Sequence, residues 1–186
     1  MNHRRPVKLL YGREGAELQL PADAVELCGK NPPAVANPGQ AVASALAAPI
    51  GAPSLIELIR RRRPETVAIT VSDITRPVPN RQFLPAMLEV LAEAGIGEER
   101  ISIIIGTGMH RPSTPEERDF ILGRDVLERI EVIDHTADRP ETLTKVSDDP
   151  PVSVCSRFAE ADFRIVTGYI EPHFMAGFSG GRKGVF

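Results

Sequence analysis

The chain has 186 residues, of which 42% are hydrophobic and 25% charged, and its formal net charge is -3. This length suits one domain of ordinary size, and the composition is that of a soluble globular protein. The negative balance gives no electrostatic basis for binding nucleic acid or an anionic membrane surface, and no apolar run approaches the length of a membrane span.

The beginning of the chain predicts a hairpin followed by two helices. Val7–Tyr11 and Ala16–Leu20 are extended segments with glycines between them, as in a hairpin turn. A segment rich in Pro, Ala and Gly follows and predicts a loop around one short helix near Gln40–Ala48. Ser54 is the expected N-cap of a second helix over Leu55–Arg63.

Neither the arginine run nor the cysteines predict a ligand site. The four consecutive arginines from Arg60 to Arg63 are typical of a helix C-terminus, where cations complement the helix dipole. No aromatic residues interleave with them, which disfavours a nucleic-acid patch. Cys28 and Cys155 lie far apart in no metal-ligand pattern, so we expect neither a disulfide framework nor a zinc site, and a reducing, cytoplasmic compartment.

The rest of the chain alternates apolar strands with helices. The predicted strands are Thr66–Val71, Ile101–Ile105, Ile130–Ile133 and Phe163–Thr167. The predicted helices are Arg81–Ala94 and Pro115–Leu122, the second of which is capped by Thr114. Asp134–Pro151 is polar and contains proline, so it predicts mostly loop. The whole pattern predicts an α/β fold: a Rossmann-like, mostly parallel sheet covered by helices, with a small N-terminal hairpin.

Three of these strands lead into polar loops, which meet at one edge of the sheet if the strands are parallel. Ligands of such folds bind outside the carboxyl ends of the strands. The first loop offers Asp73 and Thr75 as hydrogen-bonding groups, and Arg76 as a clamp for a carboxylate or phosphate. Taken alone, this loop is equally consistent with a surface turn that carries a solvated arginine.

The second loop places His110 after two glycines, whose backbone amides can approach an anion closely. A lone histidine there is also consistent with an ordinary surface group. We expect His3 to lie in a frayed terminus and His135 to be structural or at the surface. The third loop carries Glu171 and His173.

A glycine-rich stretch follows His173 and predicts a flexible anion cradle beside a reactive amine. Its members are Ser179, Gly180, Gly181, Arg182 and Lys183. The stretch lacks the spacing of a P-loop, and the alternative is a solvated tail. Histidines on two strand-end loops suggest inversion of a stereocentre, because that reaction needs a proton donor or acceptor on each face of the substrate.

Three motifs together resemble the N-terminal domain of the nickel-dependent lactate racemase family. The motifs are Ser72-Asp-Ile-Thr-Arg-Pro-Val-Pro79, Gly106-Thr-Gly-Met-His-Arg-Pro112 and Glu171-Pro-His-Phe-Met-Ala-Gly-Phe-Ser-Gly-Gly-Arg-Lys183. The opening Tyr11-Gly12 and Leu20-Pro21 also fit the start of that domain. The resemblance therefore spans nearly the whole chain.

The resemblance implies an isomerase, a racemase or epimerase of 2-hydroxy acids. The family uses a nickel-pincer cofactor, nickel pyridinium-3,5-bisthiocarboxylic acid mononucleotide, which is tethered to a lysine. Lys183 matches that lysine, His110 and His173 match the acid and base, and Arg76 matches the arginine that orients the substrate. The resemblance also implies cofactor-binding or pocket-shaping roles for a further group of residues, namely Asp73, Thr75, Ser179, Gly180, Gly181 and Arg182.

In the mechanism that the resemblance implies, one histidine takes the hydroxyl proton while hydride leaves the α-carbon for the cofactor. Return of hydride to the other face of the resulting 2-keto acid inverts the centre. The family's nickel-ligating histidine and its second domain lie beyond Phe186. We therefore expect residues 1–186 to be the cofactor- and substrate-binding domain of a larger enzyme, without bound metal or cofactor and inactive alone. The identity of the 2-hydroxy acid stays open.

Two other interpretations account for part of the same sequence. The first is a phosphate- or nucleotide-binding module without redox chemistry, which uses the glycine-rich loops and Arg76 but leaves His110 and His173 without a role. The second is an interaction domain whose glycine-rich tail docks on another chain, with no covalent adduct on Lys183.

Overall fold

The computed structural model describes residues 3–12, 14–27, 29 and 33–185. Contacts between residues divide the chain into two units, Met1–Ala34 and Val35–Phe186. The first unit contains the predicted hairpin, in which β1 (Arg4–Leu9) pairs antiparallel with β2 (Ala16–Pro21). In this register Val7 lies opposite Leu18, so apolar side chains share one face of the hairpin.

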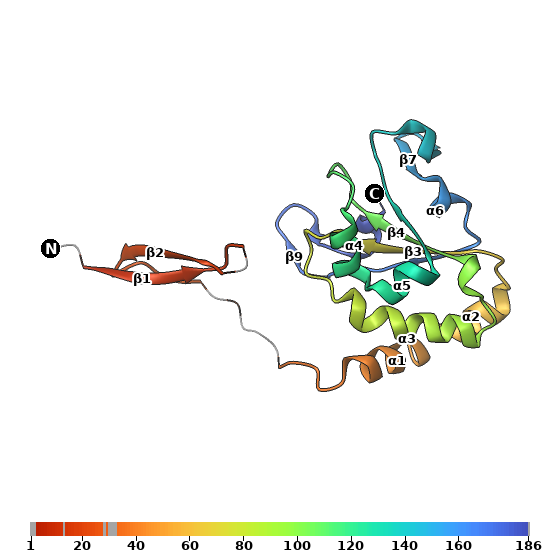
Figure 1. The fold of residues 1–186 in the computed structure, drawn as a ribbon, viewed down its shortest axis with the longest axis horizontal. Helices are drawn as coiled ribbons and strands as arrows, with labels where there is room; N and C mark the ends of the chain where they lie inside the picture. The colour runs from red at the N-terminus through yellow and green to blue at the C-terminus, as the bar shows by residue number, and fades with distance from the viewer. Residues whose placement is uncertain (1–2, 13, 28, 30–32, 186) are drawn as a thin grey trace. The chain divides into compact units, whose positions relative to one another are not determined.

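The second unit is built on a parallel four-stranded sheet in the order β5-β4-β3-β8 (Figure 1). Its strands are β3 (Val67–Ser72), β4 (Ile101–Gly106), β5 (Glu131–Asp134) and β8 (Phe163–Val166). The register aligns Ile69 with both Ile103 and Ile165. The predicted α/β class and the parallel direction of the strands are therefore confirmed.

Helices cover one face of this sheet more fully than the other. The helices are α1 (Pro38–Ala47), α2 (Leu55–Arg62), α3 (Asn80–Glu93), α4 (Pro115–Leu122), α5 (Arg124–Arg129) and α6 (Ser156–Glu160). Figure 1 shows α1, α2 and α3 below the sheet and α6 above it. Ser54 and Thr114 each form a complete capping box, so both predicted N-termini are confirmed.

Two apolar clusters pack on opposite faces of the sheet. The larger cluster joins residues such as Ile69, Leu84 and Ile103 to the helices on the lower face, and the smaller one includes Ile104 and Phe158 on the upper face. Neighbouring residues of a strand point to opposite faces. Both faces are covered, which explains why β3 and β4 are continuous apolar runs rather than alternating ones.

The prediction that Asp134–Pro151 is mostly loop is wrong in part. β6 (Leu143–Asp148) and β7 (Pro151–Cys155) form an antiparallel hairpin, with an irregularity in register between Lys145 and Ser147. The prolines and acidic residues around the turn are typical of a loop, so composition alone does not predict this hairpin. The buried side chains of Val154 and Cys155 join the upper cluster, which gives the hairpin its packing partner.

Short elements complete the structure. Helix α5 was not predicted, and the last loop contains a small antiparallel pair, β9 (Pro172–His173) with β10 (Gly177–Phe178). Three 3-10 helices span Glu98–Arg100, Pro140–Thr142 and Gly181–Gly184. Within the part of the chain that the structure describes, no helix has the length and hydropathy needed to cross a bilayer.

We expect Ile103→Ala to lower the free energy of unfolding by about 2–5 kcal/mol, because Ile103 is fully buried at the centre of the larger cluster. Denaturant titration followed by circular dichroism measures this change. Ile50→Ala is the matched control: Ile50 is fully exposed, and its replacement should change stability by less than about 0.5 kcal/mol. Equal effects of the two substitutions would contradict the described core.

Candidate functional site

The carboxyl ends of β3, β4 and β8 meet at one edge of the sheet, as predicted for parallel strands. A pocket of about 220 Å³ lies there, and we call it the inner pocket. All three predicted loops line it, through residues that include Asp73, Thr75, Arg76, His110, Ser179 and Gly180. The structure therefore brings together the hydrogen-bonding, guanidinium and imidazole groups that the sequence predicted.

Asp73 and His110 form a close polar contact in the inner pocket. The His110 Nδ1 atom lies 2.6 Å from Asp73 Oδ2, although the residues are 37 positions apart in the sequence. Asp73 is only 7% exposed, whereas the His110 side chain is 54% exposed. A carboxylate accepts hydrogen bonds, so Nδ1 donates, and the free Nε2 of a neutral His110 is an acceptor.

Thr75 fixes the other oxygen of the same carboxylate. Its hydroxyl donates to Asp73 Oδ1 at 2.6 Å, and its backbone N–H donates to the same oxygen at 3.2 Å. The three bonds hold Asp73 in one orientation and aim it at His110. Asp73 therefore joins its own loop to the neighbouring one through His110, whereas Thr75 contacts Asp73 within the same loop, and ligand binding by either residue stays a prediction.

Arg76 is exposed and lines the inner pocket. Its backbone N–H donates to the Asp73 carbonyl at 3.2 Å, which forms a tight turn at the end of β3. Within the described residues, no carboxylate lies at salt-bridge distance from its guanidinium. In the part of the chain that the structure describes, Arg76 is therefore a cation without an internal salt-bridge partner beside the Asp73–His110 pair.

His173 stands on the β9–β10 hairpin and is not among the residues that line the inner pocket. Its Nδ1 accepts the backbone N–H groups of Met175 at 3.2 Å and Ala176 at 3.1 Å. A neutral imidazole with an accepting Nδ1 carries its proton on Nε2. His173 and His110 therefore present opposite hydrogen-bonding character at their free nitrogens. The hairpin starts and ends at the inner pocket, since Tyr169 and Gly180 both line it.

The glycine-rich stretch passes close to the backbone at the start of this hairpin. A Cβ atom on Gly180 would lie 2.9 Å from the Tyr169 carbonyl oxygen, and Gly180 has φ +74°, so glycine is required. The Ser179 hydroxyl donates to the Tyr169 carbonyl at 2.7 Å and accepts the Glu171 N–H at 3.1 Å. Ser179 thus holds the loop in shape, and ligand binding by Ser179, Gly180 and Gly181 stays a prediction.

The side chains of Arg182 and Lys183 lie outside the described residues. The backbone of both belongs to the 3-10 turn Gly181–Gly184, which packs against β3 and β8. Gly184 lines the inner pocket. The backbone at Lys183 therefore lies next to the edge at which Asp73 and His110 meet.

Thr107 and Tyr169 also line the inner pocket and were not predicted as site residues. Thr107 is 2% exposed and its hydroxyl donates to the backbone carbonyl of His135, which ties the loop after β4 to the loop after β5. A threonine between two glycines after an apolar strand is the available signal for such a contact. His135 itself is partly buried, and this burial lowers the pKa of its imidazole.

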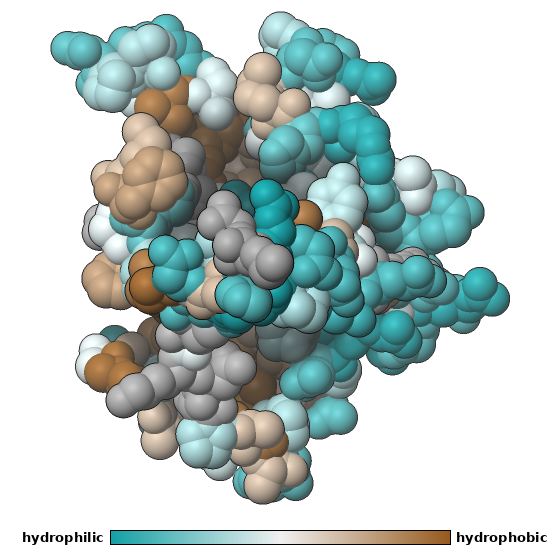
Figure 2. Space-filling view, turned by 90° about the vertical axis from the view of Figure 1, so that its left-hand side faces the viewer, coloured by the Kyte–Doolittle hydropathy of each residue, from teal (hydrophilic) through white to brown (hydrophobic). Residues whose placement is uncertain are grey.

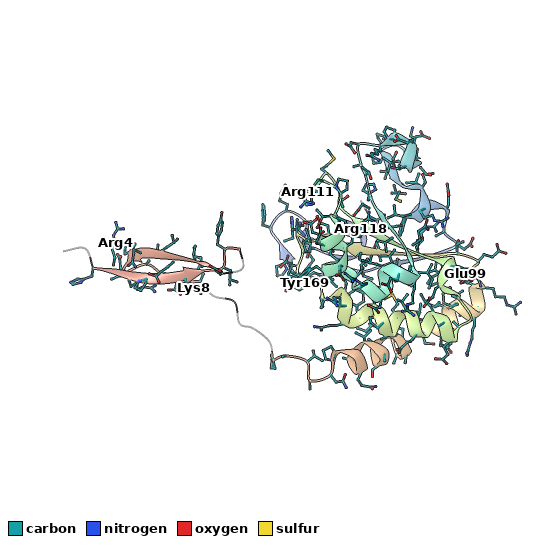
Figure 3. All side chains as sticks on the ribbon, viewed as in Figure 1. Arg4, Lys8, Glu99, Arg111, Arg118 and Tyr169 are labelled. Atoms are coloured by element: carbon teal, nitrogen blue, oxygen red, sulfur yellow. The ribbon has the colours of Figure 1, made fainter. Side chains whose placement is uncertain are left out.

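An ion pair steadies the loop that carries His110. Arg111 and Glu117 are joined by two hydrogen bonds of 2.7 Å, and Arg111 also donates to the Pro112 carbonyl. The bond from Arg111, followed by the bond from the Thr114 backbone, lowers the pKa of Glu117 to about 2. Figure 3 shows Arg111, Arg118 and Tyr169 on one side of the larger unit and Glu99 on the opposite side.

A larger cavity of about 440 Å³ lies over Thr70 and Ile104 on the upper face, against β7 and α6. Its walls are mainly apolar and carry none of the predicted catalytic side chains, so we place the site in the smaller inner pocket. Among the described residues, no group of three His, Cys, Asp or Glu side chains is arranged to hold a metal ion. On the face drawn in Figure 2, hydrophobic side chains are scattered over a mostly hydrophilic surface.

Comparison with known proteins places this geometry in context. Residues 11–186 match the family model described as the lactate racemase N-terminal domain. The chain is 39% identical to a lactate racemase of Lactiplantibacillus plantarum over 149 residues, which is 78% of this chain and 34% of that protein. It is 35% identical to a lactate racemase of Thermoanaerobacterium thermosaccharolyticum over 147 residues, again 34% of that protein.

Solved structures agree with the fold. The lactate racemase apoprotein of Thermoanaerobacterium thermosaccharolyticum superposes with a TM-score of 0.77 and 28% identity, over 97% of this chain and 43% of that one. A Thermotoga maritima protein has a TM-score of 0.58 at 22% identity, covers 80% of this chain and 38% of its own, and supports the fold alone. The chain spans about a third of the length of the curated relatives.

Proposed function

Because the chain belongs to the family of lactate racemase N-terminal domains, we propose that it holds the substrate of a 2-hydroxy acid racemase or epimerase. The observation that carries this proposal is the Asp73–His110 contact beside Arg76, which has no salt-bridge partner among the described residues, in one pocket. A 2-hydroxy acid offers a carboxylate and a hydroxyl on neighbouring carbons. The inner pocket offers a cation for the first group and an oriented imidazole for the second.

Arg76 binds the substrate carboxylate in this proposal. A guanidinium donates two parallel hydrogen bonds to a carboxylate, which fixes its orientation as well as its position. The turn at the end of β3 places Arg76 three residues after the carboxylate that orients His110. The carboxylate of the substrate is therefore held by the loop after β3, and its hydroxyl by the neighbouring loop after β4.

His110 removes the hydroxyl proton with its free Nε2, while Asp73 holds Nδ1–H and stabilises the imidazolium that forms. His173, protonated as an imidazolium, returns a proton from Nε2 on the other face of the substrate and becomes neutral, and the charged form requires Nδ1 to release the Met175 and Ala176 N–H groups. For the reverse stereochemical direction the two imidazoles exchange roles. This arrangement requires the β9–β10 hairpin to bring His173 over the inner pocket when substrate is bound.

The residues also fit the nickel-pincer pyridinium mononucleotide that the family resemblance implies. The backbones at Gly168 and Gly180 approach so closely that a side chain on either residue would be crowded. The backbone turn that contains Lys183 packs beside them, against β3 and β8. Lys183 would hold the cofactor, with Ser179, Gly180, Gly181 and Arg182 shaping the cradle around it. When bound, the cofactor would accept the hydride from the substrate α-carbon and return it to either face.

The remaining two thirds of a relative's length supply, in this proposal, a second domain that covers the pocket. We therefore expect residues 1–186 alone to bind substrate but not to racemise it. A phosphate-binding module without catalysis would account for Arg76 and the glycines. It would give the buried Asp73 carboxylate no reason to orient an imidazole, so we favour the racemase.

Arg76→Ala is expected to weaken lactate binding about 10- to 100-fold, because the bidentate hydrogen bond to a charged group is lost. Arg76→Lys should restore part of the affinity, since it keeps the charge but not the fork geometry. Isothermal titration of each variant with L-lactate measures the effect. Affinity that is unchanged in Arg76→Ala would exclude this residue as the carboxylate clamp.

A further inference from the structure

The cavity of about 440 Å³ on the upper face, which we call the upper cavity, lies between two layers of the structure (Figure 1). One wall is the sheet, through Thr70 and Ile104, and the other is formed by β7 and α6, through Val154 and Phe158. The volume of the cavity lies within the range of about 300–1,000 Å³ that is typical of small-molecule sites. The proposed function makes no use of this space.

Thr70 gives the upper cavity a polar group without a partner. The residue is only 5% exposed, and its buried hydroxyl has no hydrogen-bond partner among the described residues. Its neighbours on the same face of the sheet, Ala68 and Ile104, are apolar. A valine would fill the same space without the free-energy cost of burying an unpaired hydroxyl. A molecule in the cavity that bonds to this hydroxyl would remove that cost.

His135 and Cys155 also line the upper cavity. His135 is partly buried, and this burial lowers the pKa of its imidazole, which keeps the ring neutral at pH 7. Cys155 is 8% exposed, and its thiol is free. A neutral imidazole and a threonine hydroxyl each donate one hydrogen bond and accept others, whereas a thiol does both only weakly. These groups therefore suit a ligand group that both donates and accepts, such as a hydroxyl.

Among the described residues, no carboxylate, ammonium or guanidinium group lines the upper cavity. A carboxylate or phosphate buried there would lose its hydration without gaining a counter-charge, so the cavity disfavours anions. In this it differs from the inner pocket, which Arg76 lines. The described residues that line both cavities are Gly106, Gly108 and Gly184, so the two share backbone but no side chain.

We propose that the upper cavity binds an uncharged aromatic alcohol, with its ring between the sheet and β7 and its hydroxyl bonded to Thr70 and His135. A planar ring can contact Ile104 of the sheet with one face and Val154 of β7 with the other. Such a molecule has no carboxylate for Arg76 and is not a substrate of the inner pocket. The inference therefore goes beyond the proposed function and does not depend on it.

The test follows alkylation of Cys155 by iodoacetamide in residues 1–186 that carry Cys28→Ser, so that Cys155 is the only thiol. A molecule in the upper cavity shields this thiol, and the concentration that halves the alkylation rate measures its affinity. The probes are benzyl alcohol, toluene and benzoate, which share a ring and differ in their polar group. We expect benzyl alcohol to bind about fivefold more tightly than toluene, because of its hydrogen bond to Thr70. Benzoate should bind at least about tenfold more weakly than benzyl alcohol, because its charge has no partner.

The variants change the cavity one feature at a time. Thr70→Val keeps the shape of the side chain and removes the hydroxyl, so it should abolish the advantage of benzyl alcohol and leave toluene affinity within about twofold. Thr142→Val is the matched control, because Thr142 is exposed and is not among the residues that line the cavity, and it should keep that advantage. Val152→Phe places a ring in the cavity and should prevent protection by either probe.

The proposal is overturned if benzyl alcohol does not protect Cys155, if all three probes protect it equally, or if the advantage of benzyl alcohol survives in Thr70→Val. The circular dichroism spectrum of each variant establishes that it is folded. If Thr70→Val does not fold, Val152→Phe decides, since protection that persists in this variant places the ligand outside the cavity. No arm of this experiment uses a 2-hydroxy acid. Its failure therefore leaves the proposed function unchanged, and Arg76→Ala tests that function separately.

Discussion

Asp73→Asn is expected to lower kcat of the complete enzyme by about 10²- to 10⁴-fold, the range that a positioned acid or base contributes. The substitution keeps the size of the side chain and removes the carboxylate that holds Nδ1–H of His110. An asparagine amide can donate to Nδ1 instead, which would leave the proton on Nε2. His110 would then present a donor where the substrate hydroxyl needs an acceptor.

The tautomer of His110 can be measured, and it would not change if Asp73 had a merely structural role. The ¹⁵N shifts of the His110 ring should report a protonated Nδ1 in the parent chain and a larger share of protonated Nε2 in Asp73→Asn. Asp119→Asn is the matched control, since Asp119 is half-exposed and its carboxylate makes a 4.0 Å contact with Arg124. An Asp73→Asn enzyme with parental kcat and an unchanged tautomer would remove Asp73 from the mechanism.

Lys183→Arg is expected to abolish covalent loading and, with it, all racemase activity of the complete enzyme. A guanidinium keeps the positive charge of the lysine, but it does not form the thioamide link that the family resemblance implies. Intact-mass spectrometry after co-expression with the cofactor-forming enzymes should show a mass increment in the parent protein and none in Lys183→Arg.

The other lysines of residues 1–186 are the internal controls for this experiment: Lys8, Lys30 and Lys145. Lys145→Arg should load normally, because Lys145 lies on β6 and pairs with Asp148 away from the inner pocket. An increment that persists in Lys183→Arg, or that maps to one of these lysines, would place the tether elsewhere.

The sequence predicted the parts of the fold that depend on local pattern. The continuous apolar runs that contain Ile69 and Ile103 indicated strands covered on both faces. Ser54 and Thr114 indicated helix starts because each satisfies backbone N–H groups within three residues. The β6–β7 hairpin escaped this reasoning. Its strands show a weak alternation around Val152 and Val154, and they owe their stability to packing on Phe158 rather than to their own composition.

The members of the site were predictable, but most of their contacts were not. Parallel strands explain why Arg76 and His110 share a pocket. Nothing in the local sequence indicates that Asp73 would bind His110 rather than a ligand, because that contact depends on the register of β3 and β4. The Nδ1 contacts of His173 likewise depend on the backbone path of a hairpin that only the structure describes.

The central claim is that His110 and His173 serve one pocket that binds 2-hydroxy acids. The most direct test is an NMR titration of the histidine ring resonances of residues 1–186 with L-lactate, with His3 and His135 as internal references. We predict that the resonances of His110 and His173 shift together along a single saturation curve and that Arg76→Ala weakens both responses. If lactate shifts neither resonance, or shifts only one of them at saturation, the two histidines do not share a substrate.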